Sequence, residues 1–239
     1  MFKKRKYQSL AMVCLLLFSC NLRNNIVLEG EGKGSMALSL SLPKYMLDSV
    51  DLVAASIPGG EDLLEPENMA KGLRRSKDIS EVKVLSPQKG SYDIRFRFQN
   101  FNSGKNGKNG KGSGPDFFVW SREPGGNTQL SIVVNRQTYR ELERRFPGLR
   151  DNALLQLYGP ATTEGMDRND YLDMVEYSFG AQARKDLPEA EAVISVQVPH
   201  QVVSQSGGSR KNRNTVEFRL RLLDFALLTQ EKRYSVVYR

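Results

Sequence analysis

The chain has 239 residues, carries a formal net charge of +8 and contains two cysteines, Cys14 and Cys20, both near its start. This length accommodates one large domain or two small ones, and so few cysteines exclude a disulfide framework or a cysteine-based zinc site. The positive balance becomes modest once the basic first residues are set aside. It indicates proximity to an anionic surface more than binding to nucleic acid.

The first residues have the pattern of an export signal. Residues 3–6 read Lys-Lys-Arg-Lys, and an apolar segment from Leu10 to Phe18 follows. That segment is too short to cross a bilayer, which takes roughly 20 residues. The pattern predicts a signal peptide over residues 1–19, with cleavage between Ser19 and Cys20. A plain signal peptide, or an N-terminal helix with an incidental Cys20, is the alternative.

The stretch Leu15-Leu16-Leu17-Phe18-Ser19-Cys20 resembles the lipobox of bacterial lipoproteins, and most closely the looser form found in spirochaetes. The resemblance implies that Cys20 carries acyl chains such as palmitate and becomes the first of 220 exported residues. Two or more acyl chains anchor a protein stably. We therefore expect a lipidated tether over residues 20–24. We also expect a membrane-anchored protein of the cell envelope, in the periplasm or in the outer-membrane leaflet.

Residues 25–101 and residues 116–239 show the same succession of strand and turn patterns. "NIVLEGEGKGSMALSLSLP", from Asn25, aligns without gaps with "FFVWSREPGGNTQLSIVVN", from Phe117, and both alternate around glycine turns. "SYDIRFRFQNF", ending at Phe101, aligns with "TVEFRLRLLDF", ending at Phe225, and both pair an apolar face with an arginine face. The pattern predicts tandem β-β-α-β-β units over residues 25–101 and 116–239. A single sheet with coincidental patterning is the alternative.

The expected fold class is therefore α+β, with antiparallel sheet and helices packed on one of its faces. Helices are expected over residues 45–55, 65–75, 137–146 and 167–179. The last is the clearest, because Asp167 can cap it and Gly180 can stop it. Its apolar stripe consists of Tyr171, Met174, Val175 and Phe179. Trp120, in the second hairpin, is expected to face the core.

Residues 102–115, "NSGKNGKNGKGSGP", contain no apolar residue and are expected to form a linker or a long hairpin loop. The alternative is that Lys105, Lys108 and Lys111 touch anionic headgroups.

No pattern of residues indicates catalysis, a metal or a cofactor. His200 is the only histidine, and neither a zinc site nor a serine nucleophile motif accompanies it. Asp167, Asp170 and Asp173 are spaced three apart, which suits a solvated helix face rather than a calcium loop. "RKNRN", residues 210–214, is expected to be an exposed basic turn. The sequence thus predicts a protein that is not an enzyme.

The leading hypothesis is a binding or scaffolding role at the membrane surface, with acyl chains in the membrane and a lipid or an envelope protein as partner. The hairpin, helix and hairpin order of residues 25–101 also resembles strand-rich lipoproteins of the mycobacterial LppM-like kind, which implies contact with lipid or glycolipid. One alternative is a carrier of an apolar ligand in a cavity between sheet and helices. Another is an envelope hydrolase that uses carboxylates. The residues expected to line the carrier's cavity are Phe96, Phe98, Met174, Phe179 and Leu220.

Overall fold

The computed structural model describes residues 21–55, 66–88, 90–99, 117–145 and 153–239. One group of strands forms the sheet that we call the large sheet: β1 (Asn21–Gly30), β2 (Lys33–Ser41), β3 (Ile79–Gln88), β4 (Ser91–Phe98), β7 (Glu191–Gln197), β9 (Gly208–Arg210) and β10 (Thr215–Arg221). The small sheet consists of β5 (Phe118–Arg122), β6 (Thr128–Val134), β8 (Val202–Ser206) and β11 (Lys232–Tyr238).

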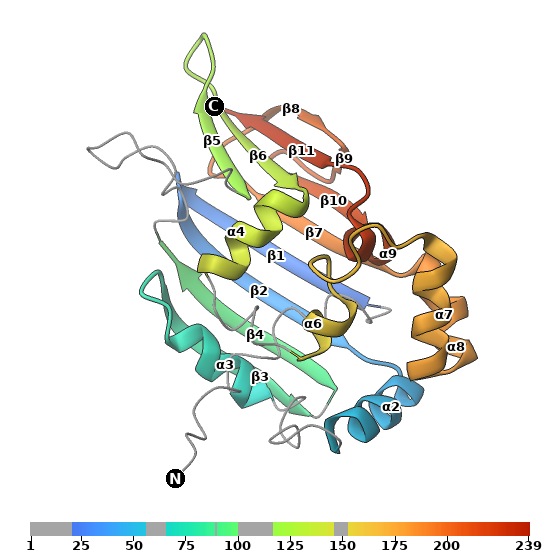
Figure 1. Ribbon diagram of the computed structural model, residues 1–239. Coiled ribbons are helices and arrows are strands. Elements are labelled where there is room, and N and C mark those ends of the chain that lie inside the picture. Colours follow the sequence, from blue (N-terminus) through green and yellow to red (C-terminus); the bar gives the residue numbers. More distant parts are fainter. Residues whose placement is uncertain (1–20, 56–65, 89, 100–116, 146–152) are drawn as a thin grey trace.

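The helices are α2 (Lys44–Ala55), α3 (Pro66–Arg74), α4 (Arg136–Arg145), α6 (Ala153–Tyr158), α7 (Arg168–Phe179), α8 (Ala181–Asp186) and α9 (Leu222–Leu227), with a short 3-10 turn η2 (Leu187–Glu189). In the described residues the strand orders are β3-β4-β2-β1-β7-β10-β9 and β5-β6-β11-β8. The α+β class expected from the sequence is confirmed (Figure 1).

Alternation along the strands gives the large sheet one apolar face. On β4, Ile94, Phe96 and Phe98 are buried while Arg95 and Arg97 are exposed. The same pattern recurs on β10, where Phe218 and Leu220 are buried and Arg219 is exposed. Because successive side chains of a strand point to opposite faces, this spacing forces one face into the core and leaves the other in solvent.

The pairing around β1 differs from the purely antiparallel sheet expected. Strand β1 pairs antiparallel with β2, from Asn21 opposite Ser41. On its other side β1 pairs parallel with β7, from Leu22 opposite Ala192. A parallel neighbour requires a long crossover connection, and here the small-sheet hairpin and several helices supply it.

The two proposed units are placed differently. All strands of the first unit lie together at one side of the large sheet, in the order β3-β4-β2-β1. In the second unit β5 and β6 belong to the small sheet, while β7 and β10 extend the large sheet. The strand pairing of the first unit is thus not repeated in the second, and the duplication itself stays a prediction.

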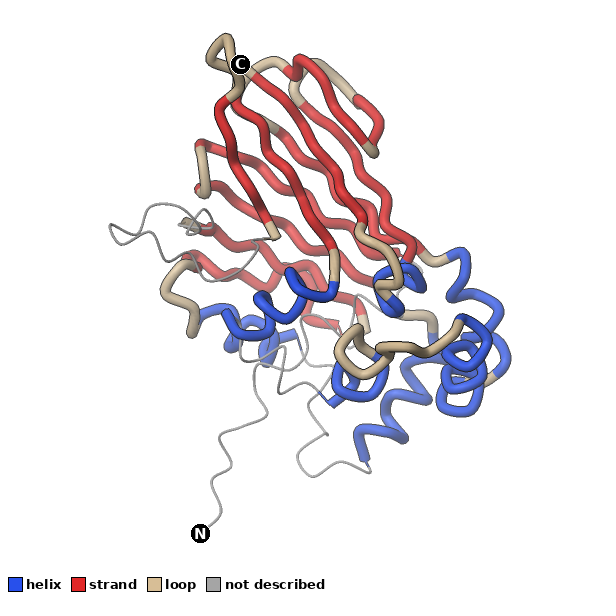
Figure 2. The backbone as a smooth tube through the Cα atoms, turned by 45° about the horizontal axis from the view of Figure 1, so that its top comes forward, coloured by secondary structure: helices blue, strands red, loops and turns tan. Residues whose placement is uncertain are grey.

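Helices α2, α7, α8 and α9 collect at one end of the strands, whereas α3 packs against β3 (Figure 2). We call this the helical end: β1 and β7 begin here, α2 follows β2 here, and α9 follows β10 here. Helix α2 packs against α7, and the Tyr45 hydroxyl donates a hydrogen bond to Asp186 at 2.6 Å. At the opposite end, which we call the turn end, β1 and β7 stop and short loops connect the strands.

The sequence places α7 correctly. The Asp167 carboxylate accepts the main-chain N–H groups of Asn169 at 2.7 Å and Asp170 at 2.9 Å, which confirms the cap. Gly180 follows the helix with φ of 84°, a backbone angle that favours glycine. Tyr171, Val175 and Phe179 are buried, so the stripe is core. Trp120 is also buried, as expected, with 7% of its surface exposed.

The expected strand ending at Phe225 is wrong in its last part. Strand β10 stops at Arg221 and α9 begins at Leu222. Leu222 and Leu223 are both buried, and two consecutive buried side chains cannot continue a half-buried strand. The Leu222 N–H instead donates to the Ala190 carbonyl at 2.9 Å, which draws the chain out of the sheet.

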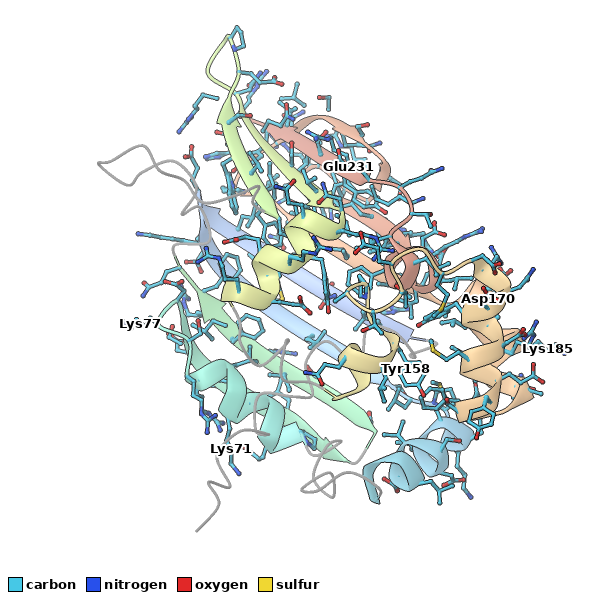
Figure 3. All side chains as sticks on the ribbon, in the orientation of Figure 1. Lys71, Lys77, Tyr158, Asp170, Lys185 and Glu231 are labelled. Carbon is cyan, nitrogen blue, oxygen red and sulfur yellow. The ribbon has the colours of Figure 1, made fainter. Side chains whose placement is uncertain are left out.

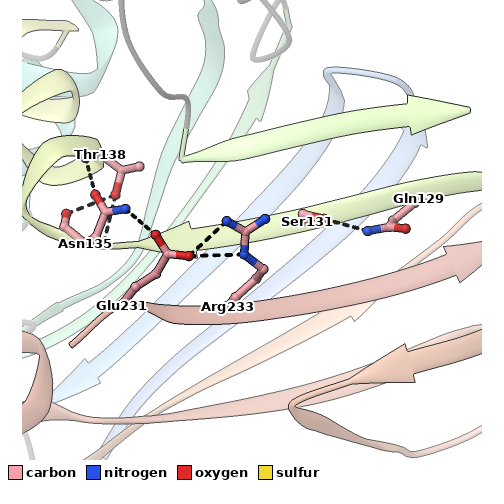
Figure 4. Close-up of polar contacts among 6 residues, drawn as sticks. All are labelled: Gln129, Ser131, Asn135, Thr138, Glu231 and Arg233. Carbon is pink, nitrogen blue, oxygen red and sulfur yellow. Dashed lines mark hydrogen bonds and ion pairs between the residues drawn. The ribbon is translucent and has the colours of Figure 1, made fainter.

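Helix α4 is fixed to the small sheet by polar contacts (Figure 4). The Thr138 N–H donates to Asn135 Oδ1 at 2.8 Å, and the Asn135 N–H donates to Thr138 Oγ1 at 3.0 Å. Asn135 also donates to Glu231 at 2.7 Å, and Arg233 donates to the same carboxylate at 2.9 Å. The hydrogen bonds from Arg233 and Asn135 hold the pKa of Glu231 below its usual value.

Candidate functional site

The residues expected to carry the lipid, Ser19 and Cys20, lie outside the described residues, as do residues 1–18 and the expected linker at 102–115. The residues that follow Cys20 do not form the expected tether. Residues 21–24 are the first part of β1: all pair with β2, and residues 22–24 also pair with β7. The described part of the chain is thus already in the sheet at Asn21, the residue bonded to Cys20.

The residues expected to line an apolar cavity belong to the core. Phe96, Phe98, Phe179 and Leu220 are buried, and Met174 of α7 is partly buried against the core. They do not form one compact group, because β2, β1 and β7 lie between β4 and β10. Four strand spacings separate the phenylalanines of β4 from Leu220, which amounts to about 19 Å.

A pocket opens at the turn end of the described chain, with a volume of about 490 Å³. It lies beyond the last residues of β7, where the chain turns into β8. The lining residues are Pro199, His200, Gln201, Arg213, Asn214 and Arg239. We call this the His200 pocket.

Main-chain hydrogen bonds join the three segments that form the His200 pocket. The Val198 N–H donates to the Asn214 carbonyl at 2.9 Å, and the Val202 N–H donates to the Arg213 carbonyl at 3.0 Å. The Arg239 N–H donates to the Gln201 carbonyl at 3.3 Å. The β7–β8 turn is thus held both by the loop before β10 and by the residue after β11.

Side chains around the basic stretch at 210–214 have distinct roles. The Arg210 guanidinium donates to the carbonyls of Asn212 at 3.0 Å and Arg213 at 3.3 Å, so it braces the loop. Lys211 pairs with Glu217 at 3.2 Å. Burial opposes ionisation of Glu217, but hydrogen bonds from Lys211 and Arg219 outweigh it and hold the pKa of the Glu217 carboxyl below its usual value.

The cationic side chains of the His200 pocket are available to a ligand. Arg213 and Arg239 form no ion pair with a described residue, and both are exposed. The Glu31 carboxylate lies close to Tyr238, the residue before Arg239. Its ion-pair partner is Arg122, at 3.0 Å, and not Arg239. No carboxylate side chain of the described residues therefore pairs with the two guanidinium groups of the pocket.

The lining residues suit binding better than chemistry. They supply one imidazole, two guanidinium groups and two amides, but no hydroxyl, thiol or carboxylate side chain that His200 could activate. Across the described residues no three His, Cys, Asp or Glu side chains are grouped to hold a metal ion.

Titratable groups outside the pocket have structural roles. Burial raises the pKa of Tyr171 far above its usual value, and its hydroxyl donates to the Tyr158 carbonyl at 3.0 Å. Asp170 and Lys185 lie on the sides of α7 and α8 that point away from the sheet (Figure 3). Asp173 and Glu176 pair with Arg184 of α8. The acidic side of α7 is therefore a solvated face, partly neutralised by α8.

Sequence reasoning identified both halves of the His200 pocket without joining them. His200 is exposed, and residues 210–213 of the basic stretch are exposed as expected, while Asn214 is half-buried. They meet because β7 and β10 are antiparallel neighbours, with Gln197 opposite Thr215. The two apolar strand patterns predict both strands but do not state that they pair with each other. The contribution of Arg239 depends on β11, a strand that the sequence analysis did not predict.

No known protein family matches the sequence, and no curated protein matches it. A comparison with solved structures found the NMR structure of the folded domain of the LppM protein of Mycobacterium tuberculosis. The two chains are 13% identical with a TM-score of 0.36, and the match covers 91% of this chain and 88% of that one. In the described part of the chain, no helix is both long and apolar enough to cross a membrane.

Proposed function

We propose that the protein is a lipoprotein of a bacterial cell envelope, anchored through acyl chains on Cys20, with a non-catalytic binding or scaffolding role at the membrane surface. The export pattern of residues 1–19 and the Leu-Phe-Ser-Cys sequence at residues 17–20 support the anchor. A globular domain so anchored needs no membrane-spanning helix, since two acyl chains suffice for stable attachment.

The start of β1 is the observation that carries this proposal. Asn21 is already hydrogen-bonded into the large sheet, and a trans peptide bond keeps the Cα of the preceding residue within about 3.8 Å of it. Acyl chains on Cys20 would therefore leave the protein directly at the helical end. The anchor would then fix the orientation of the domain as well as its location.

This attachment places the helical end against the lipid headgroups. Two apolar side chains there are exposed to solvent: Tyr177 on α7, 93% exposed, and Leu52 on α2, 75% exposed. Burial in the interfacial region would remove both from water. Along β7 and the two residues after it, a rise of about 3.3 Å per residue puts the His200 pocket about 25 Å farther from the bilayer.

The His200 pocket supports a binding role. Its position at the turn end would leave it open to the compartment outside the membrane. Its lining includes two guanidinium groups, carried on hydrogen-bonded loops, and no hydroxyl or thiol side chain. This composition suits recognition of a ligand rather than its conversion.

Metabolic labelling with radioactive palmitate tests the anchor. We expect the wild-type chain and Cys14→Ser to incorporate label and to float with membranes, because Cys14 lies in the segment that is removed. Cys20→Ser should lose the label and stay with the soluble fraction. Equal labelling of the Cys20→Ser chain, or no labelling of the wild type, would overturn the proposal.

A further inference from the structure

We propose that the His200 pocket binds a small organic anion through a carboxylate or phosphate group, with Arg213 and Arg239 as the principal contacts. The inference rests on the binding role proposed above and gives that role a ligand class. It does not require the lipid anchor.

The charge of the pocket is the first support. Two arginines of the large sheet are neutralised within the chain: Arg219 pairs with Glu191 at 3.1 Å and with Glu217 at 3.0 Å, and Arg97 pairs with Glu29. Arg213 and Arg239 have no such partner among the described residues. A guanidinium offers two parallel N–H donors that match carboxylate and phosphate oxygens.

The shape of the site is the second support. Arg23, Arg95 and Arg221 are also exposed, but they lie on strands of the large sheet and do not line the His200 pocket. Arg213 and Arg239 instead line a depression of about 490 Å³, which is within the range of small-molecule sites. A concave site surrounds an anion with several donors at once, whereas a flat face does not.

The rigidity of the loops is the third support. Each cationic residue belongs to a segment tied to a neighbouring one by the main-chain hydrogen bonds of Val198, Val202 and Arg239. The two donations from the Arg210 guanidinium fix the loop that carries Arg213. Arg210 is thus a positioning residue. Preorganised segments lose little conformational entropy when a ligand binds.

The remaining lining residues define the rest of the ligand. The ring of Pro199 offers an apolar surface and Gln201 offers an amide group, while the amide of Asn214 already donates to the Val198 carbonyl at 3.4 Å. These suit a compact molecule that carries hydroxyl or short aliphatic groups beside its anionic group. The imidazole of His200 adds a hydrogen-bond donor at the mouth of the pocket.

Calorimetric titration of the full chain in detergent tests the inference, with sn-glycerol 3-phosphate and succinate as the two probes at low ionic strength. We expect saturable binding of at least one probe. Binding of glycerol phosphate alone assigns a phosphate ligand, and binding of succinate alone assigns a carboxylate ligand.

Variants then assign the contacts. Arg213→Gln and Arg239→Gln should each weaken binding about tenfold or more, as expected when a charge-assisted hydrogen bond is lost. The matched control is Arg168→Gln, because Arg168 is exposed at the helical end and has no ion partner among the described residues. It should bind as the wild type does. All three variants should unfold at the wild-type temperature, since their side chains are exposed.

The inference fails if neither probe binds the wild-type chain, or if both pocket variants bind as tightly as the control. Palmitate labelling does not depend on these arginines. A failed titration therefore leaves the anchor untouched, and a failed labelling experiment leaves the pocket untouched.

Discussion

The helical end and the turn end of the large sheet are held together by different interactions. At the helical end, α2, α7, α8 and α9 bury aromatic and aliphatic side chains, and Tyr171 and Val175 are fully enclosed. At the turn end, main-chain hydrogen bonds join loops in which Val198 is buried but Pro199, His200, Gln201 and Arg213 are exposed. The comparison shows that the helical end is built from side-chain packing, whereas the turn end leaves its side chains free for recognition.

Truncation of a core side chain sharpens this contrast most. Phe179→Ala should lower the free energy of unfolding by about 3–5 kcal/mol, because the buried ring leaves a cavity beside Tyr158, whose ring centroid is 5.0 Å away. Val203→Ala, on the exposed part of β8, should change it by less than about 0.5 kcal/mol. Urea unfolding measures both, and similar losses at the two sites would contradict the contrast.

Arg136 tests how the helical end is joined to α4. Its guanidinium donates to the carbonyls of Pro160 and Leu227, and to that of Thr163 at 3.2 Å. Arg136→Ala should cost about 2–3 kcal/mol, because these carbonyls lose charge-assisted hydrogen bonds. Arg140→Ala removes an exposed pair with Glu164 and should cost less than about 1 kcal/mol. Thermal unfolding measures both variants. Equal stability of the two would contradict the role of Arg136 in joining α4 to the helical end.

The cap of α7 is a smaller contribution at the same end. Asp167→Ala should destabilise the protein by about 1 kcal/mol, since two main-chain N–H groups lose their acceptor. Asp167→Asn keeps an acceptor and should retain most of the stability. If urea unfolding gave the two variants the same loss, the carboxylate would owe its role to charge rather than to capping.

The smallest effect concerns pH at the turn end. Since the folded pKa of Glu217 is depressed, its contribution to stability is complete above the unfolded value of about 4.3 and disappears as pH falls through the folded pKa. Glu217→Gln should therefore flatten the decline of the unfolding free energy below about pH 4.3. It should not change the pH dependence of that free energy near neutrality. If the unfolding free energy of the variant declined with falling pH as it does in the wild type, Glu217 would not contribute to the pH dependence of stability.

The sequence predicted elements well wherever a local pattern is complete. Asp167, Gly180 and the apolar stripe between them define α7 within one residue, because cap, stop and periodicity are all local. The arginine and apolar faces of β4 and β10 were predicted for the same reason.

Long-range arrangement was harder to predict. Strand alternation does not state which strand pairs with which, so neither the parallel β1–β7 pair nor the small sheet followed from it. The His200 pocket had the same obstacle, because Arg239 reaches it only through the pairing of β11 with β6 and β8.

The orientation of the domain on a bilayer tests the account most directly. Residues 21–239 contain no cysteine, and the proposed acylation would block Cys20, so Tyr177→Cys and Val203→Cys can each carry a single fluorescent donor. The lipidated chain is placed on vesicles with acceptor-labelled headgroups. We predict strong energy transfer from position 177, at the helical end, and weak transfer from position 203. Equal transfer, or stronger transfer from position 203, would contradict the proposal that the helical end faces the membrane.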